Sequence, residues 1–436
     1  MYNTRIFYFI LGIFLMVSIL VLNGCSPYVN WEKSEESLRS QVSREANPNV
    51  APEVLDELVN GNNSFSLDLY QSVHDREGNL FFSPFSISMA LAMTYAGARE
   101  NTEAQMAQTM QFSLSQEVLH KAFNILDLDL SQIPENESNE EREQFFQLNI
   151  ANSIWGQRDY DFLTEYIDLL ALNYGAGLQL VNFAGSPEST RQTINQWIED
   201  QTAQKIKNLI PEGGIDSLTR LVLANAIYFK ADWLHTFDKN NTQDLPFYLL
   251  NGENVTVPMM SFSSSKILPY TDGEGYQAVE LPYVGGTTSM VVLIPDSGKF
   301  EAFESELTSS EVKDILNDMV PNEVELTLPK FSFESEFSLK QNLSKMGMPE
   351  AFDAGRADFS GMDGKKELFI GDIFHKAFVA VDEKGTEAAA ATAVIMEAMM
   401  APVDNIELRV DRPFIFLIRD QSTGTILFLG RVLDPS

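Results

Sequence analysis

The sequence predicts an α+β domain with large, mostly antiparallel sheets. Segments with apolar residues at three- and four-residue spacing are mixed with short β-rich runs, without the regular alternation of strand and helix that marks a parallel α/β fold. No internal repeat is present. Of the 436 residues 44% are hydrophobic, which is enough to bury one large core or two modest ones.

The N-terminus has the pattern of an export signal. Arg5 is the only charged residue before an apolar run over residues 6–22. The run leads into Leu22-Asn23-Gly24-Cys25, where Cys25 is the sole cysteine, and this resembles the lipobox of prokaryotic lipoproteins. The resemblance implies a signal peptide over 1–24, export, and a lipid anchor on Cys25 that holds the protein at the cell membrane, facing outside the cytoplasm. An uncleaved signal anchor is the alternative, because the run reaches the lower limit for crossing a bilayer.

Residues 25–53 are polar, charged and interrupted by proline, so we expect a lipidated tether without a fold of its own. From residue 54 to 436 the pattern is globular. The acidic stretch 134–144 is the one interruption and is expected to be a solvated loop. A single cysteine allows no intramolecular disulfide, so the domain must rest on its core.

Periodicity places the main elements. Apolar spacing predicts helices over 86–98 and 194–209. Runs of β-formers bounded by glycine, proline or charge predict strands over 222–229, 278–283, 290–294, 324–333 and 414–418. In the fourth run the apolar residues change from even to odd positions at Pro329-Lys330, which predicts a bulge or a change of strand partner there.

Charge and motifs exclude several functions. Lys and Arg total 30 against 62 Asp and Glu, so the net charge of −32 repels nucleic acid and heparin, and neither is an expected partner. The sequence has no G-x-S-x-G, H-E-x-x-H or phosphate-binding loop motif. The four histidines are too far apart for a local metal cluster, although a triad assembled in space stays open. We therefore predict no catalytic residue, no cofactor and no metal.

The segment 383–400 is compatible with several structures. Read with period two, its even positions from Thr386 to Met400 carry no charge, whereas Glu387 and Glu397 fall on the odd face. Such a segment could enter a sheet with its even face toward a core, and Gly385 offers a pivot just before it. An alanine-rich helix is the alternative.

Residues 383–391 resemble the mobile hinge of inhibitory serpins, and 408–418 resemble the C-terminal signature of that family at every position. Further similarity lies in 79–86, in 223–230 with Trp233, in 328–331 and in 374–377, so that it covers roughly 54–436 in the expected order. The chain thus resembles a serpin of the inhibitory class, in a prokaryotic lipoprotein form. The resemblance implies the serpin fold: three β-sheets, eight or nine helices and an exposed C-terminal reactive loop over about 383–408.

In that family a protease attacks the loop as a substrate and becomes acylated. The cleaved loop then inserts as a central strand of the large sheet, which distorts and traps the enzyme; this strand insertion is a known general case. The resemblance implies an irreversible suicide-substrate inhibitor of serine, or alternatively cysteine, proteases. It further implies a monomer that is not itself an enzyme.

The resemblance also implies roles for individual residues. The reactive bond would be Met399-Met400. The hinge comprises Glu383, Gly385, Thr386, Ala388, Ala389, Ala390 and Ala391. The insertion point comprises Trp233, Lys330 and Glu383, of which the last two could form an ion pair. The strand-opening cluster beneath the large sheet comprises Ser83, Ser86, Asn225 and His375. We expect Thr386 to be the first residue to turn inward on insertion and, before that, to lie at the edge of an exposed loop.

An unbranched apolar residue at the reactive bond suits the pocket of elastase-, chymotrypsin- or subtilisin-like proteases, and it lacks the cation that a trypsin-like pocket would pair. A non-inhibitory binding or carrier protein of the same fold is the alternative. Such relatives tend to carry bulky or charged hinge residues, whereas residues 388–391 are all alanine. A hydrolase that uses His375 with Ser83 or Ser86 is a third hypothesis, but no nucleophile motif accompanies it.

Overall fold

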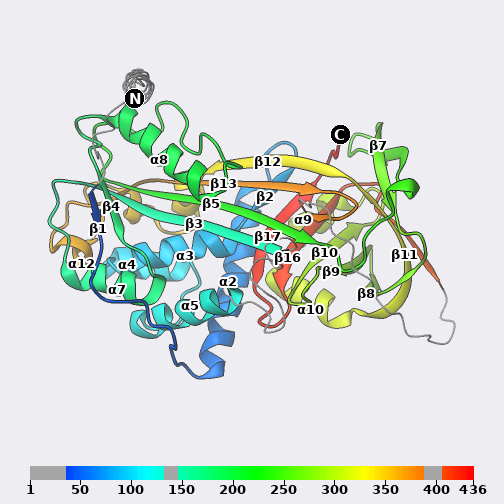
Figure 1. The fold of residues 1–436 in the computed structure, drawn as a ribbon, viewed down its shortest axis with the longest axis horizontal. Coiled ribbons are helices and arrows are strands. Elements are labelled where there is room, and N and C mark those ends of the chain that lie inside the picture. The colour runs from blue at the N-terminus through cyan, green and yellow to red at the C-terminus, as the bar shows by residue number, and fades with distance from the viewer. Residues whose placement is uncertain (1–35, 132–145, 387–404) are drawn as a thin grey trace, which may run out of the picture. The chain divides into compact units, whose positions relative to one another are not determined.

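The computed structural model describes residues 36–131, 146–386 and 405–436 (Figure 1). Apart from Glu36, the elements below lie in one compact unit, Ser37–Ser436. Several sequence predictions lie outside the described residues: Cys25, the acidic loop 134–144, the alanines 388–391 and the bond Met399-Met400. In the described ranges no helix is both long and apolar enough to cross a membrane.

Seven strands form the large sheet, here called sheet A. Their order is β1 (Glu36–Leu38), β4 (Leu178–Val181), β3 (Phe146–Gln157), β5 (Leu221–Asp232), β14 (Gly385–Thr386), β13 (Ile370–Val381) and β12 (Phe331–Ser338). The two-residue β14 separates only the ends of β5 and β13; over Leu221–Tyr228 and Ile370–Phe378 these two strands pair directly and in parallel. β5 is antiparallel to β3 on its other side, and every residue of β5 is buried. The sequence predicted β5 over 222–229 from its unbroken run of β-formers.

Helices cover both faces of sheet A. In Figure 1, α3 (Pro84–Tyr95), α4 (Glu100–Thr109), α5 (Gln116–Ser131) and α7 (Thr164–Tyr174) lie on one side and α8 (Pro187–Gln201) on the other. The remaining helices are α2 (Pro52–Val73), α9 (Phe300–Glu306), α10 (Ser309–Asp318), α11 (Lys340–Met346) and α12 (Ser360–Asp363), with short 3-10 turns at Lys239–Asn241 and Pro349–Phe352. The described residues thus hold ten α-helices where eight or nine were expected, and three of the ten have seven residues or fewer.

The helix predicted over 194–209 ends earlier, at Gln201. Ala203, Gln204 and Asn208 adopt positive φ, which the interior of a right-handed α-helix does not tolerate. Ile206 and Leu209 nevertheless pack with α8 against the outer face of sheet A, so they are buried from a loop. The periodicity therefore reported burial correctly but not helical structure.

The other strands form one ten-stranded sheet, here called sheet B. Its order is β2 (Leu80–Phe82), β17 (Ile426–Val432), β16 (Phe414–Asp420), β10 (Thr288–Pro295), β9 (Tyr276–Pro282), β8 (Lys266–Gly273), β11 (Val320–Pro329), β7 (Asn254–Ser261) and β6 (Gln243–Tyr248), with β15 (Ile406–Arg409) beside β11. The first half of β11 pairs with β8 and its end pairs with β7. This shared strand joins two groups of strands, so the described strands form two sheets instead of the three expected. The α+β class is confirmed.

The predicted change of partner at Pro329-Lys330 is confirmed. β11 ends at Pro329 in sheet B, and β12 starts at Phe331 in sheet A. A single residue between the two strands reverses which side chains face the core. Aromatic rings fill the space between the sheets: Phe81 of β2 stacks on Phe428 of β17 with ring centroids 5.0 Å apart, and Phe428 contacts Phe229 of β5 at 5.4 Å.

The second half of the expected tether belongs to the domain. The Arg44 guanidinium pairs with Asp127 of α5 at 2.7 Å and donates to Asn124 Oδ1 at 2.7 Å. The backbone N–H of Glu45 donates to the Leu172 carbonyl at 2.9 Å. These contacts are made with residues about 80 or more positions away, so the local composition gave no sign of them.

Candidate functional site

The start of the predicted reactive loop already occupies sheet A. Gly385 pairs with Asp232 of β5, and Thr386 pairs with Ala231 of β5 and with Val381 of β13. Both pairings are antiparallel, so β14 is a short central strand between two parallel neighbours. We call this position the hinge seat: Gly385 and Thr386 with their partners Ala231, Asp232 and Val381.

Glycine at 385 is required by this close approach. A Cβ built there would overlap the Ala231 carbonyl oxygen and lie 2.7 Å from the Asp232 Cα, and real Cβ atoms do not come so near to backbone. The pivot proposed for Gly385 thus acquires a second physical reason, since only a residue without a side chain fits between these strands.

The prediction that Thr386 lies at the edge of an exposed loop was wrong. Its exposed fraction is 1%, and its Oγ1 lies 2.7 Å from the Tyr283 hydroxyl oxygen. The reason is the tight turn that follows β13, in which the Asp382 N–H donates to the Gly385 carbonyl at 2.9 Å and returns the chain into the sheet. Thr386 is buried only because this turn lets it pair with β5, which lies about 150 residues earlier in the chain, so the local sequence did not indicate its burial.

Lys330 and Glu383 form the ion pair anticipated at the insertion point, with Nζ and Oε2 2.8 Å apart. Thr242 Oγ1 donates to the other carboxylate oxygen of Glu383 at 2.9 Å. Burial raises the pKa of the Glu383 carboxyl, but the hydrogen bonds from Lys330 and Thr242 outweigh burial and hold that pKa below its usual value. Glu383 is therefore a buried, charged anchor just before the hinge seat.

Trp233 fixes the other side of the turn. Its backbone N–H donates to the Lys384 carbonyl at 2.6 Å and its indole N–H donates to the Asp382 carbonyl at 3.0 Å. The indole stacks on Tyr283, with centroids 4.5 Å apart and planes 9° apart. Sequence reasoning found Trp233 but missed Tyr283 and Thr242, whose contacts with the turn are long-range.

The four residues of the strand-opening cluster do meet beneath sheet A. The Ser83 N–H donates to His375 Nε2 at 3.1 Å, so the other ring nitrogen, Nδ1, carries the proton and donates to Asn225 Oδ1. Asn225 Nδ2 donates to Ser86 Oγ at 2.6 Å. Asn152 of β3, which sequence reasoning missed, accepts from both Asn225 and Ser86.

His375 is neutral in this network. Complete burial lowers the pKa of its imidazole to about 3. His375 and Asn225 are also register partners across the β13–β5 pair. Any separation of these two strands must therefore break the hydrogen bond between the two side chains.

The same geometry does not support a hydrolase. Ser83 Oγ donates to the Leu427 carbonyl at 2.7 Å, and His375 bonds the backbone N–H of Ser83 and not its hydroxyl. Both serines are fully buried. A nucleophile must be within reach of its base and of substrate, and neither condition is met. Over the described ranges no group of three His, Cys, Asp or Glu side chains could hold a metal ion.

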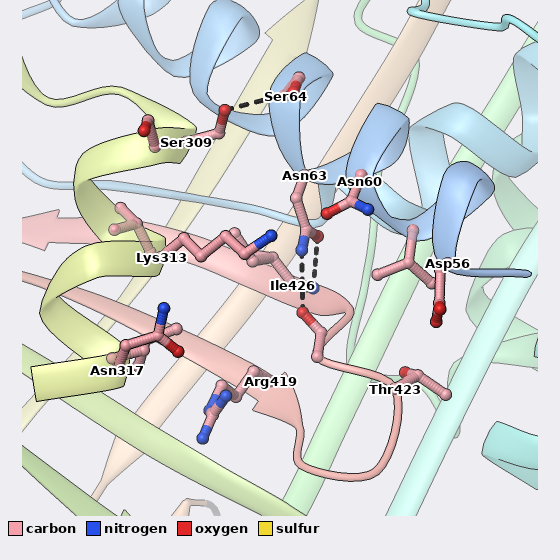
Figure 2. A pocket seen from close by; sticks show the side chains of 15 residues that line it. Asp56, Asn60, Asn63, Ser64, Ser309, Lys313, Asn317, Arg419, Thr423 and Ile426 are labelled. Atoms are coloured by element: carbon pink, nitrogen blue, oxygen red, sulfur yellow. Dashed lines mark hydrogen bonds between the residues drawn. The ribbon is translucent and has the colours of Figure 1, made fainter. Parts of the chain in front are cut away.

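A separate pocket of about 540 Å³ opens between α2, α10 and the β16–β17 turn (Figure 2). Asn63 joins two of these elements, because its Nδ2 donates to the Gly424 carbonyl at 2.9 Å and its Oδ1 accepts from the Ile426 N–H at 3.0 Å. Lys313 and Arg419 line the pocket. It is a polar recess with a partly apolar wall.

Comparisons with known proteins agree on one family. The family model described as Serpin (serine protease inhibitor) matches residues 60–435. The human leukocyte elastase inhibitor is 39% identical over an aligned length of 393 residues, and the alignment covers 87% of this chain and 100% of that protein. Two solved structures are also similar. The thermophilic serpin tengpin in its native state has a TM-score of 0.77 and 30% identity, with coverage of 91% of this chain and 97% of that one. Human thyroxine-binding globulin complexed with thyroxine has a TM-score of 0.77 and 29% identity, with coverage of 88% of this chain and 100% of that one.

Proposed function

The chain belongs to the serpin family, and from this we propose that it is an irreversible suicide-substrate inhibitor of serine proteases that traps the acyl-enzyme by inserting its cleaved loop into sheet A. The hinge seat is the observation that carries the proposal. Gly385 and Thr386 already pair with β5 and β13 in the antiparallel sense that a full central strand would need. Continued insertion would extend an existing strand and would not have to begin a new one.

The position between β5 and β13 suits a strand that inserts after the loop has been cleaved. The two strands pair in parallel from Leu221 to Tyr228, and parallel pairing is slightly less stable per residue than antiparallel pairing. An inserted strand would replace this ladder with two antiparallel ones. The loop, tied down at one end by the Lys330–Glu383 pair, would thereby gain hydrogen bonds on both sides.

We propose that the target has an apolar primary pocket of the elastase, chymotrypsin or subtilisin type. The support comes from Met399-Met400, the bond assigned by the resemblance, and from the name of the human relative, which calls that protein an inhibitor of leukocyte elastase. A cysteine protease with a similar pocket is a second target class. Export and a lipid anchor on Cys25 remain part of the proposal, and they would place the inhibitor where extracellular proteases are met.

Incubation with a small panel of serine proteases tests the proposal. We expect an adduct with an elastase-like enzyme that survives SDS, with mass spectrometry placing the cleavage at Met399. Met399→Pro is a suitable control, because proline beside the bond should block acylation and abolish the adduct. Quantitative cleavage with release of active protease, in every case tested, would contradict the inhibitory function.

Carriage of a small molecule is the second candidate, and the pocket at Lys313 and Arg419 favours it. Its volume of about 540 Å³ lies in the range of ligand pockets. Lys313 would suit an anionic ligand, whereas Arg419 is already paired with Glu280 at 2.9 Å. Thyroxine, the ligand in the structure of the human globulin, is a practical probe. Saturable binding that Lys313→Ala abolishes, together with no adduct, would favour a carrier.

A further inference from the structure

A buried carboxylate lies directly beside the hinge seat. Asp232 is the last residue of β5 and the register partner of Gly385. Its exposed fraction is 5%, and its Oδ1 has no hydrogen-bond partner among the described residues. An unpaired buried carboxylate oxygen is unfavourable when ionised, because the water that would solvate it has been removed and nothing replaces it.

The charged groups around Asp232 do not offset the effect of burial on its pKa. Burial is the main reason that the pKa of the Asp232 carboxyl rises to about 6, and Asp382 raises it further, whereas Lys230 and Lys384 oppose the rise. Lys230 lies on β5, and Asp382 and Lys384 belong to the turn before β14. The connection after β9 approaches through the N–H of Val284, which donates to the Asp232 carbonyl at 2.8 Å. That connection, residues 283–287, carries no ionised side chain.

The turn that leads into β14 lies against the end of β5, next to Asp232. Trp233 donates its N–H to the Lys384 carbonyl, and the Asp382 carboxylate in turn accepts from the Lys384 N–H at 2.8 Å. If Gly385 and Thr386 left the seat, this turn would detach from β5 and the Asp232 side chain would meet water. Ionisation is then no longer penalised, and the carboxyl should titrate near its ordinary value.

We propose that Asp232 makes occupation of the hinge seat depend on pH, so that β14 is held when Asp232 is protonated and is released more readily when Asp232 is ionised. The sign follows from the linkage of proton binding to conformation. The seated form binds the proton more tightly than the open form, so acid favours the seat and the effect is lost above the seated pKa. Regulation of inhibition by this means rests on the proposed function, whereas the seating equilibrium does not.

Hydrogen–deuterium exchange of the full chain measures the seat without any protease. The amides of Trp233 and Phe237 report directly, since they donate to the Lys384 and Glu383 carbonyls and these bonds exist only while the turn is docked. After correction for the intrinsic pH dependence of exchange, the protection of peptides containing these amides should rise about tenfold between pH 7 and pH 5. In Asp232→Asn the protection should already be high at pH 7 and should change little with pH.

Two variants serve as matched controls. Asp382→Asn removes a carboxylate from the turn before β14, and His235→Gln removes the histidine three residues after Asp232, a side chain that ordinarily titrates in this range. His235→Gln should keep the pH dependence of the wild type. Asp382→Asn should keep its direction with a slightly smaller amplitude, because Asp382 is the smaller of the two causes that raise the pKa of Asp232. Asp232→Ser provides a second neutral variant if Asp232→Asn does not fold, and it should behave in the same way.

Flat protection in the wild-type chain would overturn the proposal, as would pH dependence that survives in both neutral variants of Asp232 or disappears in His235→Gln. An adduct assay on the same samples separates the two proposals. A pH-dependent seat without adduct would refute inhibition alone, and an adduct with a pH-independent seat would refute the role of Asp232 alone.

Discussion

Thr386→Arg is the most direct test of strand insertion, and the buried seat changes what it should do. The sequence suggested that the uncleaved protein would tolerate arginine at this position. Thr386 is instead 1% exposed and bonded to Tyr283, so arginine must either bury its cation in the intact protein or leave the seat. Its register partners there are Ala231 and Val381, which offer no opposite charge.

The expected magnitude has two parts. Loss of the bond to Tyr283 leaves a buried hydroxyl unpaired, at a cost of about 1–3 kcal/mol. A buried cation without a partner costs several kcal/mol more. Trapping is a race between insertion and deacylation, and each ~1.4 kcal/mol added to the insertion barrier slows insertion about tenfold. An arginine that has left the seat in the intact protein meets these costs on insertion, which should therefore slow by a factor of a thousand or more, and the protease should escape.

The assay is the stoichiometry of inhibition, with SDS gels to separate adduct from cleaved chain. Thr386→Arg should be cleaved as a substrate, and the uncleaved variant should also melt at a lower temperature than the wild type. Thr386→Val, which removes only a hydrogen bond already made in the intact protein, should lower the melting temperature but leave the rate of insertion nearly unchanged, because the resting and inserted forms lose the bond alike. Thr386→Ser should change little.

A Thr386→Arg protein that still forms the covalent adduct with wild-type stoichiometry would refute the insertion mechanism. An unchanged melting temperature would refute a different step, namely that the seat is occupied before cleavage. The two readouts therefore test the mechanism and the resting state separately.

Four further predictions follow from individual residues. The folded pKa of His375 is about 3 and the unfolded value is near 6.5, so the unfolded chain binds the proton first. His375 should therefore lower the free energy of unfolding by about 1.4 kcal/mol per pH unit below 6.5, in addition to the contribution of His120, and His375→Gln should lessen the total slope in denaturant titrations at pH 7 and pH 5. Met399→Arg should shift inhibition toward trypsin-like enzymes, and an unchanged target spectrum would place the reactive bond elsewhere. Mass spectrometry of the mature N-terminus should find a diacylated Cys25, and an intact Met1 would contradict the lipobox. On insertion Thr392 should arrive beside His375, so Thr392→Val should lower the melting temperature of the cleaved protein more than that of the intact one.

Much of the fold was predictable because its signals are local. β9, β10 and β16 were each predicted to within two residues at either end, since unbroken β-rich runs bounded by glycine, proline or charge have few other solutions. The change of face at Pro329-Lys330 fixed the step from one sheet to the other. The Lys330–Glu383 pair was anticipated as well, but only through the family resemblance, because 53 residues separate the two.

The rest of the site could not be predicted because its contacts join distant segments. Tyr283 reaches Thr386 across 103 residues, and Asn225 reaches Asn152 across 73. Neither tyrosine nor asparagine has a local pattern that announces such a partner. Burial of Thr386 depends on the same kind of contact, which is why the period-two pattern gave its face correctly and its exposure incorrectly.

The register of sheet A relates the position of the strand-opening cluster to that of the hinge seat. The seat pairs Thr386 with Ala231 and Val381, while the cluster pairs Asn225 with His375. From 231 to 225 on β5 and from 381 to 375 on β13, the chain runs six residues in each case. Six is even, so an inserted strand would bring Thr392 to the cluster on the same face as Thr386. Buried polar groups are costly only while unpaired, so a hydroxyl that arrives as the Asn225–His375 bond breaks would let the strands part without leaving either group unsatisfied.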